Sequence, residues 1–208
     1  MTPRRLPRSF FARPTLTVAK DLLGMVLVHR APDGLTSGRI VEVEAYIGED
    51  DPACHAAPGP TARNAPLYGP PGVAYVYLNY GLHFLMNVVT ERRGFPAAVL
   101  IRALEPLEGL ALMQRRRVAH GARAHRVTAD TNCKGPGNLS VAMGITLARN
   151  RTDLTGSTLY LEDRGLAAIE IAWTPRIGIR VGMDRMWRAV DAQSRAMTGR
   201  APRAISPI

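Results

Sequence analysis

Residues 39–47 read RIVEVEAYI, and from Val41 onwards apolar and other side chains alternate one by one. A period of two predicts a β-strand with one face in the core. The core face would carry Val41, Val43, Ala45 and Ile47. The other face would carry Glu42, Glu44 and Tyr46. A carboxylate and a phenol would then stand side by side on a face that is either solvent-exposed or the wall of a pocket.

Other strands are predicted on both sides of this one in the sequence. They cover Met25–His29, Tyr75–Leu78, Phe84–Val89, Ala98–Leu104, Thr158–Leu161 and Ile169–Trp173. Asn79-Tyr80-Gly81 is a hairpin-turn signal between two of them. Helices are expected at Thr15–Leu23, Leu107–Arg117 and Asn138–Met143. The dominance of strands without regular βαβ alternation predicts one α+β domain over residues 1–208, with a curved antiparallel sheet, peripheral helices and a protruding hairpin.

Half of the chain's six tyrosines, namely Tyr75, Tyr77 and Tyr80, fall within six residues. Tyr75 and Tyr77 would share a strand face, and Tyr80 would occupy the tip of the hairpin. Aromatic rings stack on nucleobases, and they also fill the gap when a duplex is opened. The alternative is a tyrosine-rich strand that is partly core. The preceding Gly48–Gly72 segment is a long aperiodic loop, a kind of segment that is often functional.

The charge of the chain points to a polyanionic partner. There are 27 Lys and Arg against 17 Asp and Glu, a formal net charge of +10 over 208 residues. This excess favours nucleic acid ahead of an anionic membrane surface, with a merely basic soluble protein as the alternative. No apolar run is long enough to span a membrane, and the basic N-terminus lacks the apolar core of an export signal. Cys54 and Cys133 form no disulfide framework, so a cytoplasmic location is expected, associated with the nucleoid if the protein is bacterial.

Several long blocks of the sequence form one ordered pattern. They are GRIVEVEAYIGEDDPACHA from Gly38, TARN from Thr61, GPPGVAYVYLNYGLHFLMNVV from Gly69 and AAVLIRALEPLEGL from Ala97. FFARPTLTVAKDLLG, KGPGNLSVAMGI and PRIGI extend the pattern over about residues 10–180. In this order the blocks resemble the alkyladenine (3-methyladenine) DNA glycosylase family. The tail after Trp187 departs from the family, which usually has an aromatic-rich stretch there.

The resemblance implies a monofunctional DNA glycosylase of base excision repair. Such an enzyme flips alkylated or deaminated purines, among them 3-methyladenine, ethenoadenine and hypoxanthine, out of duplex DNA and hydrolyses their N-glycosidic bond. The implied fold is one mixed domain around a curved antiparallel sheet, acting as a monomer without a cofactor or metal. A non-catalytic module that binds damaged DNA, and a hydrolase of small nucleosides, are the alternatives.

The resemblance also assigns roles to residues. Glu44 would activate the attacking water, and Tyr80 would replace the extruded nucleotide. Tyr46, His55 and Tyr77 would enclose the flipped base, and His55 would also hydrogen-bond it. Asn87 would crowd the 2-amino group of normal guanine, and Arg102 would lie near the backbone of the flipped nucleotide.

Two further expectations come from the residues themselves. Strand cleavage needs an amine nucleophile, and the only lysines, Lys20 and Lys134, lie outside the matched catalytic blocks, so no lyase step is expected. Glu42 is expected to be structural or solvated rather than a second catalytic carboxylate. Arginines that could hold phosphates are Arg115, Arg116, Arg117, Arg123 and Arg126.

Overall fold

Strand β3 (Gly34–Ile47) is the centre of the sheet in the computed structural model, which describes residues 2–199. Along one edge it pairs with β6 (Ala97–Glu108). Along the other it pairs first with β2 (Val26–Ala31) and then with β9 (Arg188–Asp191). The remaining strands are β1 (Arg4–Arg5), β4 (Ala74–Asn79), β5 (His83–Val89), β7 (Leu159–Asp163) and β8 (Ile171–Thr174). Within the described residues the sheet has nine strands in the order β1-β7-β2-β3-β6-β5-β4, with β8 added beyond β9. Each of these pairings is antiparallel, which confirms the predicted fold class.

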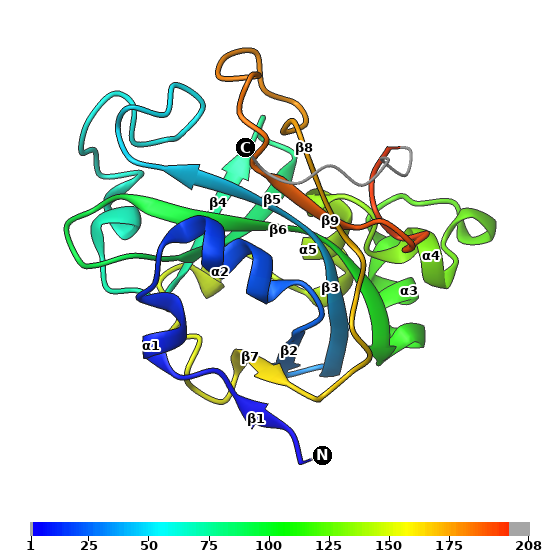
Figure 1. Cartoon of the computed structure of the whole chain (residues 1–208). Helices are drawn as coiled ribbons and strands as arrows, with labels where there is room; N and C mark the ends of the chain where they lie inside the picture. Colours follow the sequence, from blue (N-terminus) through cyan, green and yellow to red (C-terminus); the bar gives the residue numbers. More distant parts are fainter. Residues whose placement is uncertain (1, 200–208) are drawn as a thin grey trace.

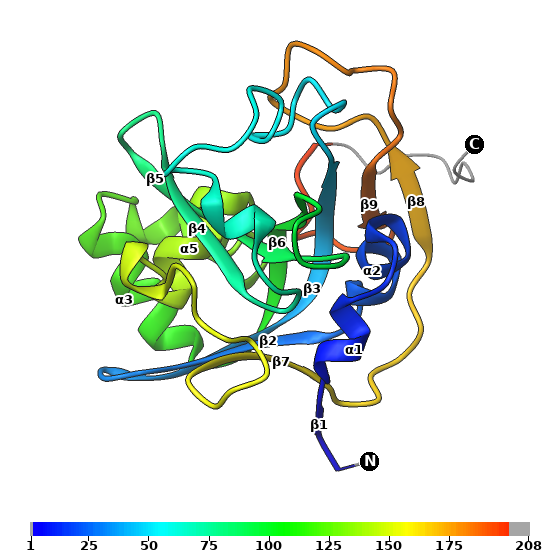
Figure 2. The ribbon, with the colours of Figure 1, turned by 90° about the vertical axis from the view of Figure 1, so that its left-hand side faces the viewer.

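The helices cover the sheet from two sides (Figure 1). The helices are α1 (Arg8–Phe11), α2 (Thr15–Leu22), α3 (Leu110–Ala119), α4 (Ala129–Asn132) and α5 (Pro136–Met143), with 3-10 turns η1 (Ala65–Tyr68), η2 (Ala124–Arg126) and η3 (Leu147–Arg149). In Figure 2 the hairpin of β4 and β5 projects from the body, as predicted.

Two boundaries differ from the sequence prediction for a steric reason. Strand β6 runs on through Glu108, so the helix expected at Leu107–Arg117 begins only at Leu110. Gly109 separates the two elements with a φ of +76°. A Cβ there would lie 2.3 Å from the carbonyl oxygen of Leu35, so the close approach of β3 requires glycine at the break. The short elements β1, α1, α4 and β9 were not predicted.

A pair of bulges in β3 and β6 changes which side chains share a face. Ile40 pairs with Leu104 and Glu42 with Ala103, which leaves Val41 as an extra residue in β3. Val43 then pairs with Ile101, which leaves Arg102 as the extra residue in β6. The expectation that Val41 lies in the main core is therefore wrong: Ile40 joins Val43 and Ala45 there. Val41 packs in a separate cluster instead, with Ala103 and Ala196.

The main core lies on one face of these strands. It contains Val18 and Leu22 from α2, Val76 from β4, Met86 from β5 and Ile101 from β6. Alternate residues of β4, β5 and β6 point to the opposite face, where they meet the Gly48–Gly72 loop. Between residues 2 and 199, no helix is long and apolar enough to cross a membrane.

Candidate functional site

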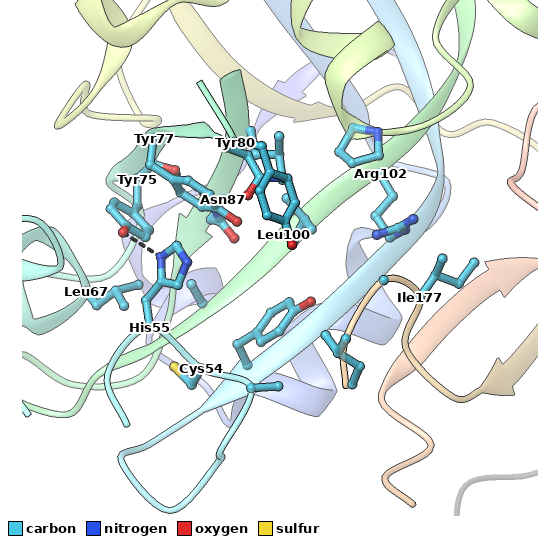
Figure 3. Close-up of a pocket in the computed structure, with 18 residues that line it drawn as sticks. Cys54, His55, Leu67, Tyr75, Tyr77, Tyr80, Asn87, Leu100, Arg102 and Ile177 are labelled. Atoms are coloured by element: carbon cyan, nitrogen blue, oxygen red, sulfur yellow. Dashed lines mark hydrogen bonds between the residues drawn. The ribbon is translucent and has the colours of Figure 1, made fainter. Parts of the chain in front are cut away.

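A pocket of about 380 Å³ lies on this second face of the sheet (Figure 3). The strands β4, β5 and β6 form its floor, the loop after β3 forms one wall and the segment after Pro175 forms the opposite wall. Six of the seven predicted site residues line it, namely Tyr46, His55, Tyr77, Tyr80, Asn87 and Arg102. The seventh, Glu44, lies directly behind the wall, since it contacts three lining residues.

Glu44 is fully buried and accepts three hydrogen bonds. Its Oε2 atom accepts the Tyr46 hydroxyl at 2.9 Å and Nη1 of Arg102 at 3.0 Å. Its Oε1 atom accepts the backbone N–H of Ile177 at 2.7 Å. The alternative that Glu44 stands on a solvent-exposed face of the sheet is therefore wrong. Oε1 has one protein partner and retains a second lone pair.

Glu42 is equally buried and accepts four hydrogen bonds, one more than Glu44. Oε1 accepts Nε of Arg102 at 2.8 Å, Nε of Arg188 at 2.7 Å and the Thr198 hydroxyl at 2.5 Å, and Oε2 accepts the Thr198 N–H at 2.7 Å. Burial raises the pKa of Glu42, but Arg102, Arg188 and the bonds from Thr198 outweigh it, so its pKa lies below the usual range. Of the two expected environments, structural and solvated, the solvated one is excluded.

Aromatic rings line the pocket on the side of β4. The imidazole of His55 packs edge-on against the Tyr77 ring, with 4.4 Å between the ring centroids, and the ring centroids of Tyr75 and Tyr77 are 5.2 Å apart. Nδ1 of His55 is 2.8 Å from the Tyr75 hydroxyl. Burial raises the pKa of Tyr75 to about 12, so the phenol keeps its proton and can either donate to Nδ1 or accept from it. Burial, with a smaller contribution from Arg63, lowers the pKa of His55.

Two other predicted residues lie on the pocket floor and at the tip of the hairpin. Asn87 is buried, and its amide donates to the Tyr75 carbonyl at 3.1 Å, so its orientation is fixed. Tyr80 lies at the tip of the hairpin and is 87% exposed. Its φ of +49° is unusual for a residue with a side chain.

One group that supports the site was not predicted from the sequence. The buried guanidinium of Arg176 binds both carboxylate oxygens of Asp51, at 2.6 and 2.8 Å, and the Ala45 carbonyl at 3.1 Å. It also lies over the ring of Tyr46 at 4.7 Å and over that of Trp187 at 5.2 Å. Asp51 lies in the loop flagged as functional and Arg176 in the PRIGI block, but 125 positions separate them and no spacing rule joins such a pair.

Residues of the C-terminal tail and of the basic end of α3 also stabilise the fold. Residues after Trp187 were expected to depart from the family pattern, but Arg188 and Thr198 hold Glu42; positions 200–208 of that tail lie outside the described residues. Of the arginines predicted to hold phosphates, Arg116 binds Asp33 and Arg117 binds Asn138. The exposed ones are Arg115, Arg123 and Arg126.

The titratable side chains suggest no metal centre in the part of the chain that is described. Between residues 2 and 199, no three His, Cys, Asp or Glu side chains come together in a way that could hold a metal ion. Cys54 lines the pocket, and burial raises its pKa to about 11.

Comparison with known proteins gives a consistent result. The family model described as methylpurine-DNA glycosylase matches residues 9–195. A protein of Methanocella arvoryzae is 52% identical over 201 residues, which cover 95% of this chain and 97% of that protein. Proteins of Chlorobium phaeobacteroides and Rubrobacter xylanophilus are 46% and 49% identical, and the matches cover 94% and 89% of this chain and 96% and 92% of those proteins. All three carry the provisional name 3-methyladenine DNA glycosylase.

Proposed function

The chain belongs to the methylpurine-DNA glycosylase family, and on that premise we propose that it flips damaged purines out of duplex DNA and hydrolyses their N-glycosidic bond at Glu44. As a member of that family it is a DNA N-glycosylase of DNA repair. The proposed substrates are 3-methyladenine, 1,N6-ethenoadenine and hypoxanthine.

The observation that carries the proposal is a buried carboxylate held rigidly directly behind the wall of an aromatic pocket. Tyr46, Arg102 and the Ile177 N–H fix the Glu44 carboxylate, and in this proposal the second lone pair on Oε1 accepts a proton from a water molecule that enters from the pocket. A general base must be within hydrogen-bond reach of the proton that it takes. The water oxygen then bonds to C1′ of the sugar, the bond from C1′ to the base breaks, and its electron pair leaves with the purine.

The pocket has the size and lining for a flipped base. Its 380 Å³ fall within the ~300–1,000 Å³ of ligand pockets. Extrusion of a base costs a few kcal/mol, and stacking on aromatic side chains returns ~1–3 kcal/mol per base. A purine alkylated at N3 or N7 is cationic, so it is attracted to the π faces of Tyr46 and Tyr77 and leaves readily.

Neutral lesions need help at the base itself. In this proposal the Tyr75 hydroxyl donates to Nδ1 of a neutral His55, so the imidazole carries its proton on Nε2, and Nε2–H donates to a neutral lesion such as hypoxanthine. Asn87, on the floor, would crowd the 2-amino group of guanine, and Arg102 would lie beside the flipped nucleotide.

The remaining expectations complete the proposal. Tyr80, exposed at the hairpin tip, would fill the gap left by the flipped nucleotide. The protein would act as a monomer, with one domain over its 208 residues. It would have no lyase step: the lysine Nζ of Lys134 is bound to the Arg195 carbonyl at 3.1 Å, and Lys20 lies in α2 against the other face of the sheet. Reduction with borohydride during turnover should trap no covalent adduct with DNA.

The deciding experiment compares the wild type with Glu44→Gln on duplexes that each carry one proposed lesion. Free base is quantified by chromatography, and DNA binding is measured on the same duplexes. Base release by the wild type, lost in Glu44→Gln while binding persists, supports the proposal. Binding of lesion duplexes by the wild type without release of any base would contradict it and favour a non-catalytic binding module.

A further inference from the structure

The large apolar side chains that face solvent are concentrated at two places around the pocket. Six of the eleven exposed large hydrophobic residues in the described part of the chain lie in two short segments. One is the hairpin tip, with Leu78, Tyr80 and Leu82. The other is the segment after Pro175, with Ile177, Val181 and Met183, which are 39%, 49% and 60% exposed and which we term the apolar lip. Exposed apolar patches of this kind mark interaction surfaces.

The apolar lip and the hairpin tip lie on opposite sides of the same pocket. Tyr80 lines it on one side, and Ile177, Gly178 and Ile179 line it on the other. Figure 3 shows Tyr80 and Ile177 separated by the width of the pocket. In Figure 1 and Figure 2 the segment after Pro175, drawn in orange, and the hairpin rise from the same end of the molecule.

The lip is anchored at its base. The guanidinium of Arg176 donates to the Gly182 carbonyl at 3.3 Å, so it ties both ends of the turn together. Gly182 has a φ of +61°, and a Cβ there would lie 3.1 Å from Nη2 of Arg176 and 3.5 Å from the Asp51 carboxylate. Arg185 donates to the Asp50 carbonyl at 3.0 Å and lies over the Trp187 ring at 4.5 Å. These contacts hold the turn in place while its apolar side chains point to solvent.

We propose that the apolar lip is a second DNA contact, which packs Val181 and Met183 against the minor-groove side of the duplex across the pocket from Tyr80. This rests on the proposed function. A duplex that places one nucleotide in the pocket must lie against both rims, since Tyr80 lines the pocket on one side and Ile177, the first residue of the lip, lines it on the other. The flanking Arg180 is exposed, and the net charge of +10 suits a polyanion. Apolar side chains inserted from the minor groove stabilise a bent, opened duplex.

The native cysteines make a cross-linking test possible. Both are buried, and burial raises the pKa of Cys54 to about 11 and that of Cys133 to about 12, so neither competes as a thiolate near neutral pH. Val181→Cys would then carry the reactive thiol. Its thiolate attacks a mixed disulfide tethered in the minor groove next to ethenoadenine, forms a protein–DNA disulfide and releases the small thiol of the tether. The matched control is Leu166→Cys, since Leu166 is 39% exposed in the connection between β7 and β8.

The expected result is a cross-link for Val181→Cys within one or two base pairs of the lesion, and none for Leu166→Cys. Val181→Ser with Met183→Ser should also bind the lesion duplex roughly tenfold more weakly, whereas Leu166→Ser should bind as the wild type does. No cross-link together with unchanged affinity overturns the proposal. So does loss of self-association in the double variant, because the lip would then join two copies of the chain. Base release by the wild type, measured in parallel, separates failure of the lip from failure of the proposed function.

Discussion

Arg102 joins two buried carboxylates with one guanidinium: its Nε is 2.8 Å from Oε1 of Glu42, and its Nη1 is 3.0 Å from Oε2 of Glu44. The two carboxylates differ in the groups that hold them. Glu42 accepts four hydrogen bonds, from Arg102, Arg188 and Thr198, whereas Glu44 accepts three, all from residues that line the pocket. Glu42 is therefore bonded mainly to groups outside the pocket lining, and Glu44, which we propose as the general base, is bonded only to the pocket wall.

Glu42→Gln should reduce stability more than catalysis. The substitution leaves Arg102 and Arg188 buried with one carboxylate fewer, and breaking a buried ion pair costs ~3–5 kcal/mol. Urea unfolding should show a loss of that size, while base release per folded molecule stays within a few-fold of the wild type. A stable but inactive Glu42→Gln protein would mean that Glu42 takes part in the reaction.

Tyr80→Gly should separate stability from DNA opening. Glycine adopts the φ of +49° at this position without strain, and Tyr80 is 87% exposed, so the thermal midpoint should be unchanged or higher. Loss of a stacking ring should weaken binding of lesion duplexes by ~1–3 kcal/mol, about 5- to 150-fold. Calorimetry and equilibrium titration measure the two effects. Equal affinity of both proteins for the lesion duplex would exclude Tyr80 as the wedge.

His55→Ala should impair excision of hypoxanthine more than that of 3-methyladenine. The cationic base leaves without a proton donor, whereas in our proposal the neutral base uses Nε2–H, the tautomer that results when Tyr75 donates to Nδ1. Single-turnover rates on the two duplexes measure the difference. Tyr75→Phe is a matched variant, because it keeps the ring and removes only the bond at 2.8 Å to Nδ1. Equal losses on both substrates would contradict a role for His55 specific to neutral bases.

The sequence was sufficient to predict the strands around the site because short-range alternation determines them. The faces of β4 and β5 follow directly from the period of two, which brings Tyr77 and Asn87 into one pocket. The bulge at Val41 could not be predicted, since an apolar residue at that position fits an even strand equally well. The continuation of strand β6 past Leu107 depends on the close approach of Gly109 to β3, and this contact joins residues far apart in the sequence.

The candidate site residues were predictable mainly from the family resemblance, and the residues that support them were not. A carboxylate beside a tyrosine on a strand face fits an exposed edge as well as a pocket, and only burial of Glu44 decides between them. The pairing of Asp51 with Arg176 and of Glu42 with Arg188 joins positions 125 and 146 residues apart. Such contacts are products of the tertiary fold, so a local pattern cannot reveal them.

Acid should destabilise the protein in part through His29. This side chain is 1% exposed, and burial lowers its pKa, so the folded state resists a proton that the unfolded chain binds near pH 6.5. As the pH falls below 6.5, the free energy of unfolding should decrease by at most about 1.4 kcal/mol per pH unit for this group, until the pH passes the lowered value. His55 adds a contribution of the same sign.

The measurement compares urea unfolding at pH 7.5 and 5.5. His29→Leu loses the 2.7 Å bond between Nδ1 and the Met143 carbonyl, so it should be less stable at both pH values, but the difference between them should shrink. An unchanged difference would assign the acid sensitivity to other groups.

Arg176→Met should lower kcat with little effect on KM. Arg176 lies behind Tyr46 and orients the chain at Ile177, whose N–H holds Glu44. Its loss should therefore displace the carboxylate that we propose as the general base, rather than the surface that first meets DNA. Small displacements of catalytic groups cost on the order of 100-fold in rate. Arg176→Lys keeps the charge but lacks the planar fork for Asp51, so it should recover only part of the rate.

Arg13→Met is the matched control for this prediction. Arg13 also lies over an aromatic ring, that of Phe10 at 4.3 Å, and binds a carboxylate, Asp21 at 2.7 Å, and a backbone carbonyl. It belongs to the α1–α2 region, on the other side of the sheet from the pocket. Its removal should lower stability and leave kcat unchanged at temperatures where the protein is folded. If Arg176→Met and Arg13→Met lose the same fraction of kcat, or if Arg176→Met changes only KM, Arg176 does not position Glu44.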